Sequence, residues 1–98
     1  MNEYFMEIGL DINTEQLQEV AQALANETRL QILLVLKTHR EISHKELAEF
    51  IGKSPATVSS HMKYLKRAGI LEDVSLKGLR GRIKKVPRFL VNEIVIKL

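Results

Sequence analysis

The 98-residue sequence has no cysteine, no tryptophan and only two prolines. The lack of cysteine excludes disulfide bonds, thiolate metal sites and a cysteine nucleophile. No apolar run approaches the roughly 20 residues that a membrane-spanning helix needs. Residues 1–12 carry acidic groups where a secretion signal has a basic start and an apolar middle. We therefore expect a cytoplasmic protein that does not contact a membrane.

Positive charge is concentrated in the second half of the chain. Residues 1–50 hold four Lys or Arg and nine Asp or Glu, whereas residues 51–98 hold eleven and three, so the net charge of +3 hides a strongly basic half. Such a division indicates that the basic half meets a polyanion such as nucleic acid. A solvated basic face, which is common on small domains, would give the same composition, so charge alone leaves both interpretations open.

The apolar pattern predicts a single domain over residues 1–98. Apolar residues make up 45% of the chain and charged residues 28%, as in a folded domain rather than a disordered tail. The expected parts are an N-terminal strand or arm (1–13), helices (14–69), a β wing (70–86) and a C-terminal strand (90–98). The first strand is predicted from the alternation over 6–12. Pro87 is expected to interrupt the ladder of the wing, because proline has no N–H to donate.

Within 14–69 the periodicity predicts four helices, at about 14–25, 27–38, 44–51 and 55–68. The first has one apolar stripe: Leu17, Val20, Ala21, Leu24 and Ala25. The second is apolar on nearly all sides and is expected to be the central core helix. Ser43 and Glu46 match a capping box before the third helix. Gly52 and Gly69 are expected to end the third and fourth helices.

The third and fourth helices, joined by residues 52–54, are typical of a helix-turn-helix. Ser54 is expected to cap the fourth helix, with Pro55 at its first position. If Val58, Met62 and Leu65 face inward, five side chains face largely outward: Ala56, Ser59, Ser60, Lys63 and Arg67. Thr57 and Ser59 lie in the first turns, the end of such a helix that enters the major groove. Surface serines selected for solubility would produce the same pattern.

The predicted hairpin after the fourth helix is unusually basic. Its cations are Lys77, Arg80, Arg82, Lys84 and Lys85, which surround two glycines. An arginine at such a tip can enter the narrow minor groove, where the potential is most negative. The sequence therefore predicts an α+β fold, a mostly helical winged helix-turn-helix with a small antiparallel β wing, that binds double-stranded DNA.

Two segments carry a family resemblance. Residues 23–33 (ALANETRLQIL) resemble the opening signature of ArsR-type, arsenic-repressor-like winged-helix regulators, and residues 58–65 (VSSHMKYL) with 68–71 (AGIL) resemble the recognition-helix motif of that family. The resemblance covers about residues 17–86. It implies a dimeric transcriptional regulator that reads a dyad-symmetric operator. It also implies a DNA-facing set of Thr57, Ser59, Ser60, His61 and Lys63, with Arg82 on the wing.

No metal, cofactor or catalytic activity is expected. Metal-sensing members of the family carry cysteines in the third helix, and the matching stretch 46–51 has none. The three histidines, His39, His44 and His61, show neither i, i+4 pairing nor a carboxylate cluster. No catalytic triad signature, phosphate-cradling glycine loop or paired-carboxylate motif is visible. The chain is therefore predicted not to be an enzyme.

The sequence is best interpreted as a transcriptional regulator that represses as a homodimer on double-stranded DNA. A winged-helix adaptor between proteins is the alternative, and an effector sensor with a pocket at the dimer interface is a second. The usual C-terminal dimer helix of the family is replaced by an expected strand, so residues 4–25 and 90–98 are the candidate dimer segments. We expect the two terminal strands to pair in one sheet, within or between chains. If they only cover their own core, the protein is a monomer.

Overall fold

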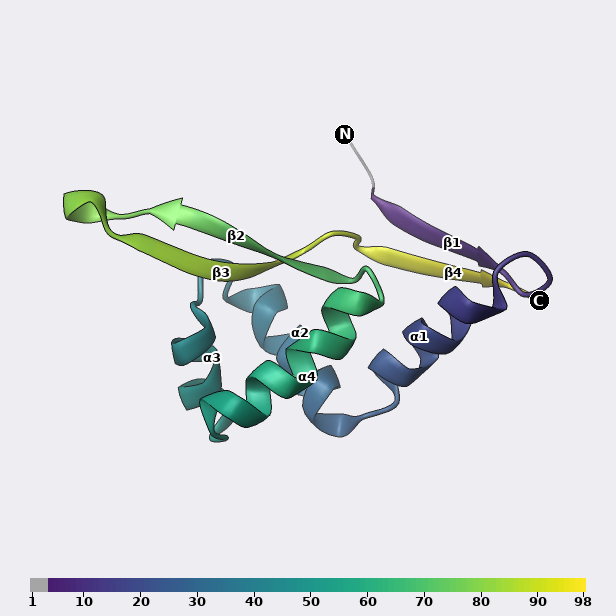
Figure 1. Cartoon of the computed structure of the whole chain (residues 1–98), viewed down its shortest axis with the longest axis horizontal. Helices are drawn as coiled ribbons and strands as arrows, with labels where there is room; N and C mark the ends of the chain where they lie inside the picture. The colour runs from purple at the N-terminus through teal and green to yellow at the C-terminus, as the bar shows by residue number, and fades with distance from the viewer. Residues whose placement is uncertain (1–3) are drawn as a thin grey trace.

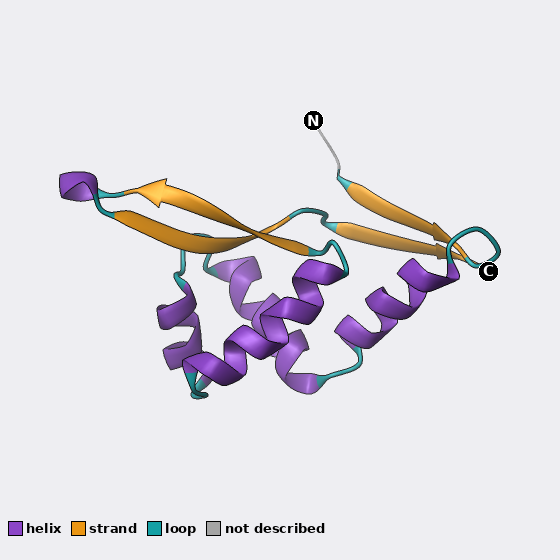
Figure 2. Ribbon diagram, in the orientation of Figure 1, coloured by secondary structure: helices purple, strands orange, loops and turns teal. Residues whose placement is uncertain are grey.

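A computed structural model describes residues 4–98 of the chain. In chain order the elements are β1 (Phe5–Gly9), α1 (Thr14–Leu24), α2 (Glu27–Thr38), α3 (His44–Ile51), α4 (Pro55–Arg67), β2 (Leu71–Lys77), the 3-10 turn η1 (Leu79–Gly81), β3 (Ile83–Phe89) and β4 (Glu93–Lys97). Four helices pack beneath two separate two-stranded sheets (Figures 1 and 2). The predicted α+β class with an antiparallel wing is confirmed. Residues 1–3 of the expected N-terminal arm lie outside the described residues.

Each helix begins at a polar residue whose side chain accepts a backbone N–H of the first turn. The caps are Asn13, Asn26, Ser43 and Ser54, with N···O distances of 3.1 Å in each case. At α3 the predicted capping box is complete, because the Ser43 N–H also donates to Glu46 Oε1 at 2.9 Å. These caps satisfy backbone donors that a helix leaves without partners. They explain why the observed helix starts agree with the predicted ones.

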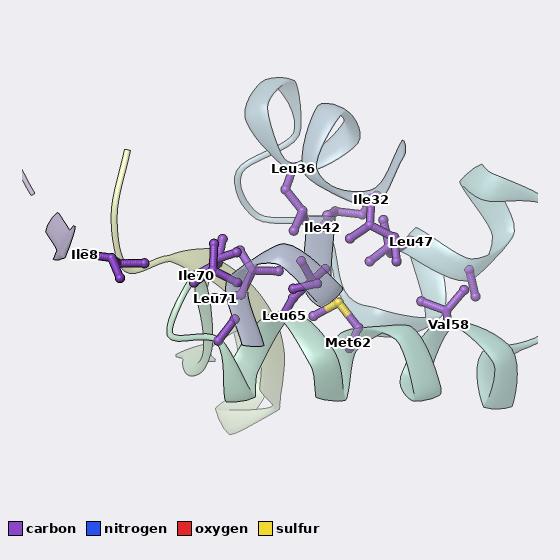
Figure 3. Close-up of a cluster of buried hydrophobic side chains, with 14 residues drawn as sticks. Ile8, Ile32, Leu36, Ile42, Leu47, Val58, Met62, Leu65, Ile70 and Leu71 are labelled. Carbon is purple, nitrogen blue, oxygen red and sulfur yellow. The ribbon is translucent and has the colours of Figure 1, made fainter. Parts of the chain in front are cut away.

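One continuous apolar core joins the helices to the base of both sheets (Figure 3). The row of Val58, Met62 and Leu65 on α4 is buried, as the sequence predicts. It meets Ile32 of α2 and Leu47 of α3, both fully buried. Since α4 contacts all three other helices and β2, its orientation is fixed from several sides.

Two predicted apolar surfaces are only partly buried. Along α2, Ile32 and Leu36 are buried, but Leu30 and Leu34 are exposed, so the prediction of a helix enclosed on nearly all sides is wrong. Leu30 and Leu34 are one turn apart, so they lie on the same face of the helix, and that face is exposed. On α1 the small buried residue is Ala23 rather than the predicted Ala21.

The wing is a strongly twisted antiparallel pair, β2 with β3 (Figure 1). Its ladder continues through Pro87, which is opposite Asp73, so the predicted interruption at Pro87 is wrong. In a two-stranded sheet every second backbone N–H points away from the partner strand. A proline on such an edge strand removes no ladder hydrogen bond. Pro87 is buried at the base of the wing.

The two terminal strands pair with each other in parallel, β1 with β4, within the same chain. The predicted pairing of the terminal segments is thereby confirmed. Met6 and Ile8 share a face of this sheet with Ile94 and Ile96, and Ile8 is fully buried. Gly69, just after α4, has φ +77°, and a Cβ there would lie 3.2 Å from the Met6 Cε atom. The end of α4 therefore packs directly against β1.

Among the described helices, none combines the length and the apolar content that crossing a bilayer requires.

The burial of Ile8 predicts that β1 is an integral part of the core. We expect Ile8→Ala to lower the free energy of unfolding by about 2–5 kcal/mol, because it removes a buried side chain and leaves a cavity. The control is Phe5→Ala on the same strand, whose exposed side chain should contribute much less. Urea denaturation followed by circular dichroism measures both. Equal losses in the two variants would contradict the packing described here.

Candidate nucleic-acid interface

The side of α4 opposite its buried row is exposed and polar. Four side chains follow one line along it, at helical spacings of four, three and four residues: Ala56, Ser60, Lys63 and Arg67. We call these four the exposed row. Ala56 and Ser60 are small, so a ligand can approach the helix backbone closely at this end. The two cations stand toward the C-terminal half, and all four are exposed as the sequence predicts.

Hydroxyl groups cluster at the first turns of α4. The Ser54 hydroxyl accepts the Thr57 backbone N–H at 3.1 Å and donates to Thr57 Oγ1 at 2.9 Å. Ser54 is therefore engaged in the helix cap, while the hydroxyl hydrogen of Thr57 remains free to donate. Ser59 is exposed and lies on the flank of α4 that carries Lys66, toward the wing.

The wing projects beyond α3 at the same end of the molecule as the start of α4 (Figure 1). Lys77, Arg80, Arg82 and Lys85 are all exposed along it. Arg80 sits in the 3-10 turn at the tip with φ +62°. Such a backbone conformation is unusual for a residue with a side chain. The tip thus presents its arginines at the point farthest from the core.

Lys84 differs from the other wing cations because it has an acidic partner. Its Nζ lies 2.8 Å from Glu46 Oε1. The ion pair with Lys84 and the hydrogen bonds from Ser43 lower the pKa of Glu46 to about 2. Lys84, a predicted DNA contact, therefore links β3 to the first turn of α3 through its ion pair with Glu46.

A second ionic contact fastens the base of the wing. Asp73 of β2 accepts from His44 Nε2 of α3 at 2.6 Å and from Lys66 Nζ of α4. Burial opposes ionisation of Asp73, but the hydrogen bonds from Lys66 and His44 outweigh it and lower the pKa of this carboxyl. One carboxylate thus links β2 to both helices of the helix-turn-helix.

The other flank of α4 is held by a buried cation, Arg29 of α2. Its side chain is 8% exposed. The Nε and Nη2 atoms donate to the carbonyls of Ala23 at 2.9 Å and Gln22 at 2.8 Å, at the end of α1. The guanidinium carbon lies 4.3 Å from the centre of the Tyr64 ring. Arg29 therefore connects α1, α2 and α4.

Arg29 also determines the tautomer of His61, a predicted DNA contact. Arg29 Nη1 is 3.1 Å from His61 Nδ1. Because a guanidinium only donates, Nδ1 must accept, which assigns the ring proton to Nε2. Desolvation, followed by the positive charges of Arg29 and Lys53, lowers the pKa of His61 below 6.5. His61 is therefore half-buried and neutral, with its Nε2–H as the free donor.

A shallow hollow lies between this flank of α4 and Arg29. Its lining is Arg29, Ala56, Thr57, Ser60, His61 and Tyr64. The sequence did not lead us to predict Arg29 as part of this surface, although it lies within residues 23–33, one of the two segments that resemble the ArsR-type family. A signal was present, because no Asp or Glu stands three or four residues from Arg29 along its helix. An arginine in an apolar helix without such a partner indicates a tertiary contact.

No group of three or more His, Asp or Glu side chains within 4–98 is arranged to hold a metal ion. His44 and His61 are engaged with Asp73 and Arg29, and His39 caps α2.

Comparison with known proteins identifies this architecture. Residues 26–72 match a family described as winged helix-turn-helix DNA-binding. The chain contains a winged helix-turn-helix DNA-binding domain. Its structure is similar to a homodimeric winged helix-turn-helix DNA-binding domain (fragment 1-100) from Mycobacterium bovis, a possible ArsR-family transcriptional regulator, with 30% identity and a TM-score of 0.62. The match covers 79% of this chain and spans 66% of the length of that chain. The winged-helix class predicted from the sequence is confirmed.

The low pKa of His61 predicts how the stability of the winged-helix domain depends on pH. As pH falls below 6.5, the unfolded chain protonates this histidine first, so the folded state loses stability until the pH reaches the lower folded pKa. Thermal melts between about pH 7.5 and about pH 5.5 should show this loss. His61→Gln keeps an acceptor for Arg29 but does not titrate, so its loss should be smaller. Identical slopes in the two proteins would contradict the assignment.

Proposed function

We propose that the protein is an ArsR-type transcriptional repressor that binds a dyad-symmetric operator in double-stranded DNA as a homodimer. The chain acts as one domain, with no catalytic activity and no required metal. The observation that carries the proposal is that the wing tip and the first turns of α4, where Ala56 and Ser60 are exposed, lie at one end of the molecule (Figure 1). A helix with small and cationic side chains fits the major groove, and a wing tip reaches an adjacent minor groove.

The proposed contacts divide into two groups. On and before α4 they are Ser54, Ala56, Thr57, Ser59, Ser60, His61, Lys63 and Arg67. On the wing they are Lys77, Arg80, Arg82, Lys84 and Lys85. Of these, Ser54 and Lys84 are already engaged with Thr57 and Glu46, so we assign them positioning roles. Ala56 leaves room for the ligand, and the other side chains supply donors and positive charge, which suit phosphates and base acceptors.

The alternative function, an adaptor between proteins, predicts exposed apolar side chains on the fourth helix. Every large apolar residue of α4 is buried or half-buried in the structure. An adaptor surface of this kind needs a desolvated apolar centre. The composition of α4 therefore favours DNA as its partner.

The homodimer is supported by the β1–β4 sheet. An isolated two-stranded parallel sheet is marginal, and both of its edges carry unpaired backbone groups. At its far end lies a cluster of exposed apolar side chains, which we call the terminal patch: Leu10, Ile12, Ile96 and Leu98. Leu10 is tied to β4 by its N–H bond to the Lys97 carbonyl at 2.9 Å. The structural neighbour is described as homodimeric, which supports a dimer for this chain as well.

The wing is expected to contribute affinity without sequence preference. Replacing Arg80 and Arg82 with alanine should weaken binding to operator and random duplexes alike. It should reduce the slope of log K against log salt by about two for each protomer, and so by about four for the dimer. Fluorescence anisotropy at several salt concentrations measures this. The double variant Lys37→Ala/Arg40→Ala removes the same charge at exposed positions outside both the proposed DNA contacts and the terminal patch, and should leave the slope nearly unchanged. Unaltered binding after loss of both wing arginines would remove the wing from the interface.

Sequence preference is expected to depend on the exposed row of α4. Ser60→Ala or Lys63→Ala should cost about 1–3 kcal/mol of binding free energy on the preferred site and much less on random DNA. Competition gel shifts with the two kinds of duplex measure the difference. An equal loss on both would make these residues phosphate contacts. No loss on either would favour the adaptor function.

The terminal patch is expected to hold the dimer together. Ile12 and Leu98 are 86% and 95% exposed, so the double variant Ile12→Asp/Leu98→Asp leaves the core intact while placing charges in the interface. We expect sedimentation to show a dimer for the unmodified protein and a monomer for this variant. Leu79→Asp, at a wing-tip residue that is 91% exposed, is the matched control and should remain dimeric. A dimer that persists in the double variant would move the interface to the exposed Leu30 and Leu34 of α2.

A further inference from the structure

We propose that the hollow between Arg29 and α4 is a seat for one phosphate of the DNA backbone, formed by Arg29 with Thr57 and His61. This inference rests on the proposed function and adds Arg29, a residue of α2, to the interface.

The charge of Arg29 is the first argument. None of the ion pairs found within residues 4–98 includes this side chain, although it is almost completely buried. Its carbonyl partners, Gln22 and Ala23, belong to the C-terminal end of α1. A helix end offers roughly half a negative charge, so it compensates the guanidinium only in part. A buried cation of this kind is stabilised by an anion that docks beside it.

The second argument is that the hollow offers donors. Arg29 has five N–H groups, and its hydrogen bonds within 4–98 use three of them. His61 offers Nε2–H, because its Nδ1 accepts from Arg29. Thr57 offers its hydroxyl hydrogen, because its oxygen already accepts from Ser54.

This donor set suits a phosphate better than most base edges. Phosphodiester oxygens only accept hydrogen bonds, whereas in the major groove only guanine presents acceptors alone, adenine and cytosine carry a donor, and thymine carries a methyl group. No carboxylate lines the hollow, and Lys53 adds positive charge nearby. The hollow lies on the flank of α4, beside the exposed row. A helix in the major groove has the phosphates of the bordering strand on its flanks, so the position suits a backbone contact.

The fixed geometry of the seat also favours this ligand. The Tyr64 ring centre lies 4.3 Å from the guanidinium carbon, and the two carbonyls of α1 accept two of its N–H groups. A cation held in this way loses little conformational entropy when it binds. Ala56, on the wall of the hollow, leaves space for the phosphate group.

The first test uses the unmodified protein and dimethyl phosphate, a small phosphodiester. Nuclear magnetic resonance should show a saturable shift of the Arg29 Nε–H and Thr57 backbone N–H signals. Sodium chloride at equal ionic strength should not produce it. If these two signals do not move with dimethyl phosphate, the seat does not exist.

A duplex titration separates the seat from the proposed function. Binding of the duplex with shifts at Arg29 and Thr57 supports both. Binding that shifts the wing arginines but leaves Arg29 and Thr57 unchanged overturns the seat and retains the function. Absence of any duplex binding overturns the proposed function, whatever the response to dimethyl phosphate.

Variants measure the contribution to affinity. Thr57→Val keeps the shape but removes the donor, so duplex affinity should fall about 2- to 10-fold. Its matched control is Thr38→Val at the exposed end of α2, which should have no effect. Arg29→Gln should reduce the salt slope by about one for each protomer, and so by about two for the dimer. If Arg29→Gln fails to fold by circular dichroism, the result with Thr57→Val decides, and unchanged affinity in that variant contradicts the seat.

Discussion

The arrangement of the three longest helices depends on one buried cation. Arg29 must satisfy its donors away from water, since an unpaired buried guanidinium would cost several kcal/mol. It does so by taking the last carbonyls of α1, the imidazole of His61 and the ring face of Tyr64. These partners reach Arg29 only when the end of α1 and the helix α4 lie at their observed positions. Apolar packing alone tolerates sliding of one helix over another, whereas this set of directional bonds specifies one register.

On the opposite flank of α4 the central charged group is an anion instead of a cation. There a carboxylate, Asp73, receives donors from α3 and α4, and Lys84 of the wing pairs with Glu46. One flank of α4 is thus tied to the first two helices and the other to the wing. Between them the exposed row faces solvent without distortion of the helix. Functional side chains on a rigid element, supported from both sides, are held in place before a ligand arrives.

Local chemistry allowed the sequence to predict most of the fold. The box formed by Ser43 and Glu46, for example, gives the start of α3 without any tertiary information. The errors have tertiary causes. Leu34 is apolar yet exposed, because burial depends on which neighbours arrive. Pro87 stays in the ladder because its strand lies at an edge. Of the candidate site, the outward side chains of α4 follow from helical period, but the contact of Arg29 with His61 joins residues 32 apart, beyond any local pattern.

The length of α4 connects the proposed DNA-binding end with the proposed dimer joint. Thirteen residues of helix span about 20 Å. One end carries Ala56 and Thr57, and beyond the other Gly69 packs on Met6 of β1. Two copies joined near β1 would therefore separate the starts of their α4 helices by about 40 Å when the helices point directly apart, and by less when they tilt. This range includes the roughly 34 Å between successive major grooves on one face of DNA. The α4 helix itself can thus serve as the spacer between the two DNA-binding ends, provided that the terminal strands form the joint.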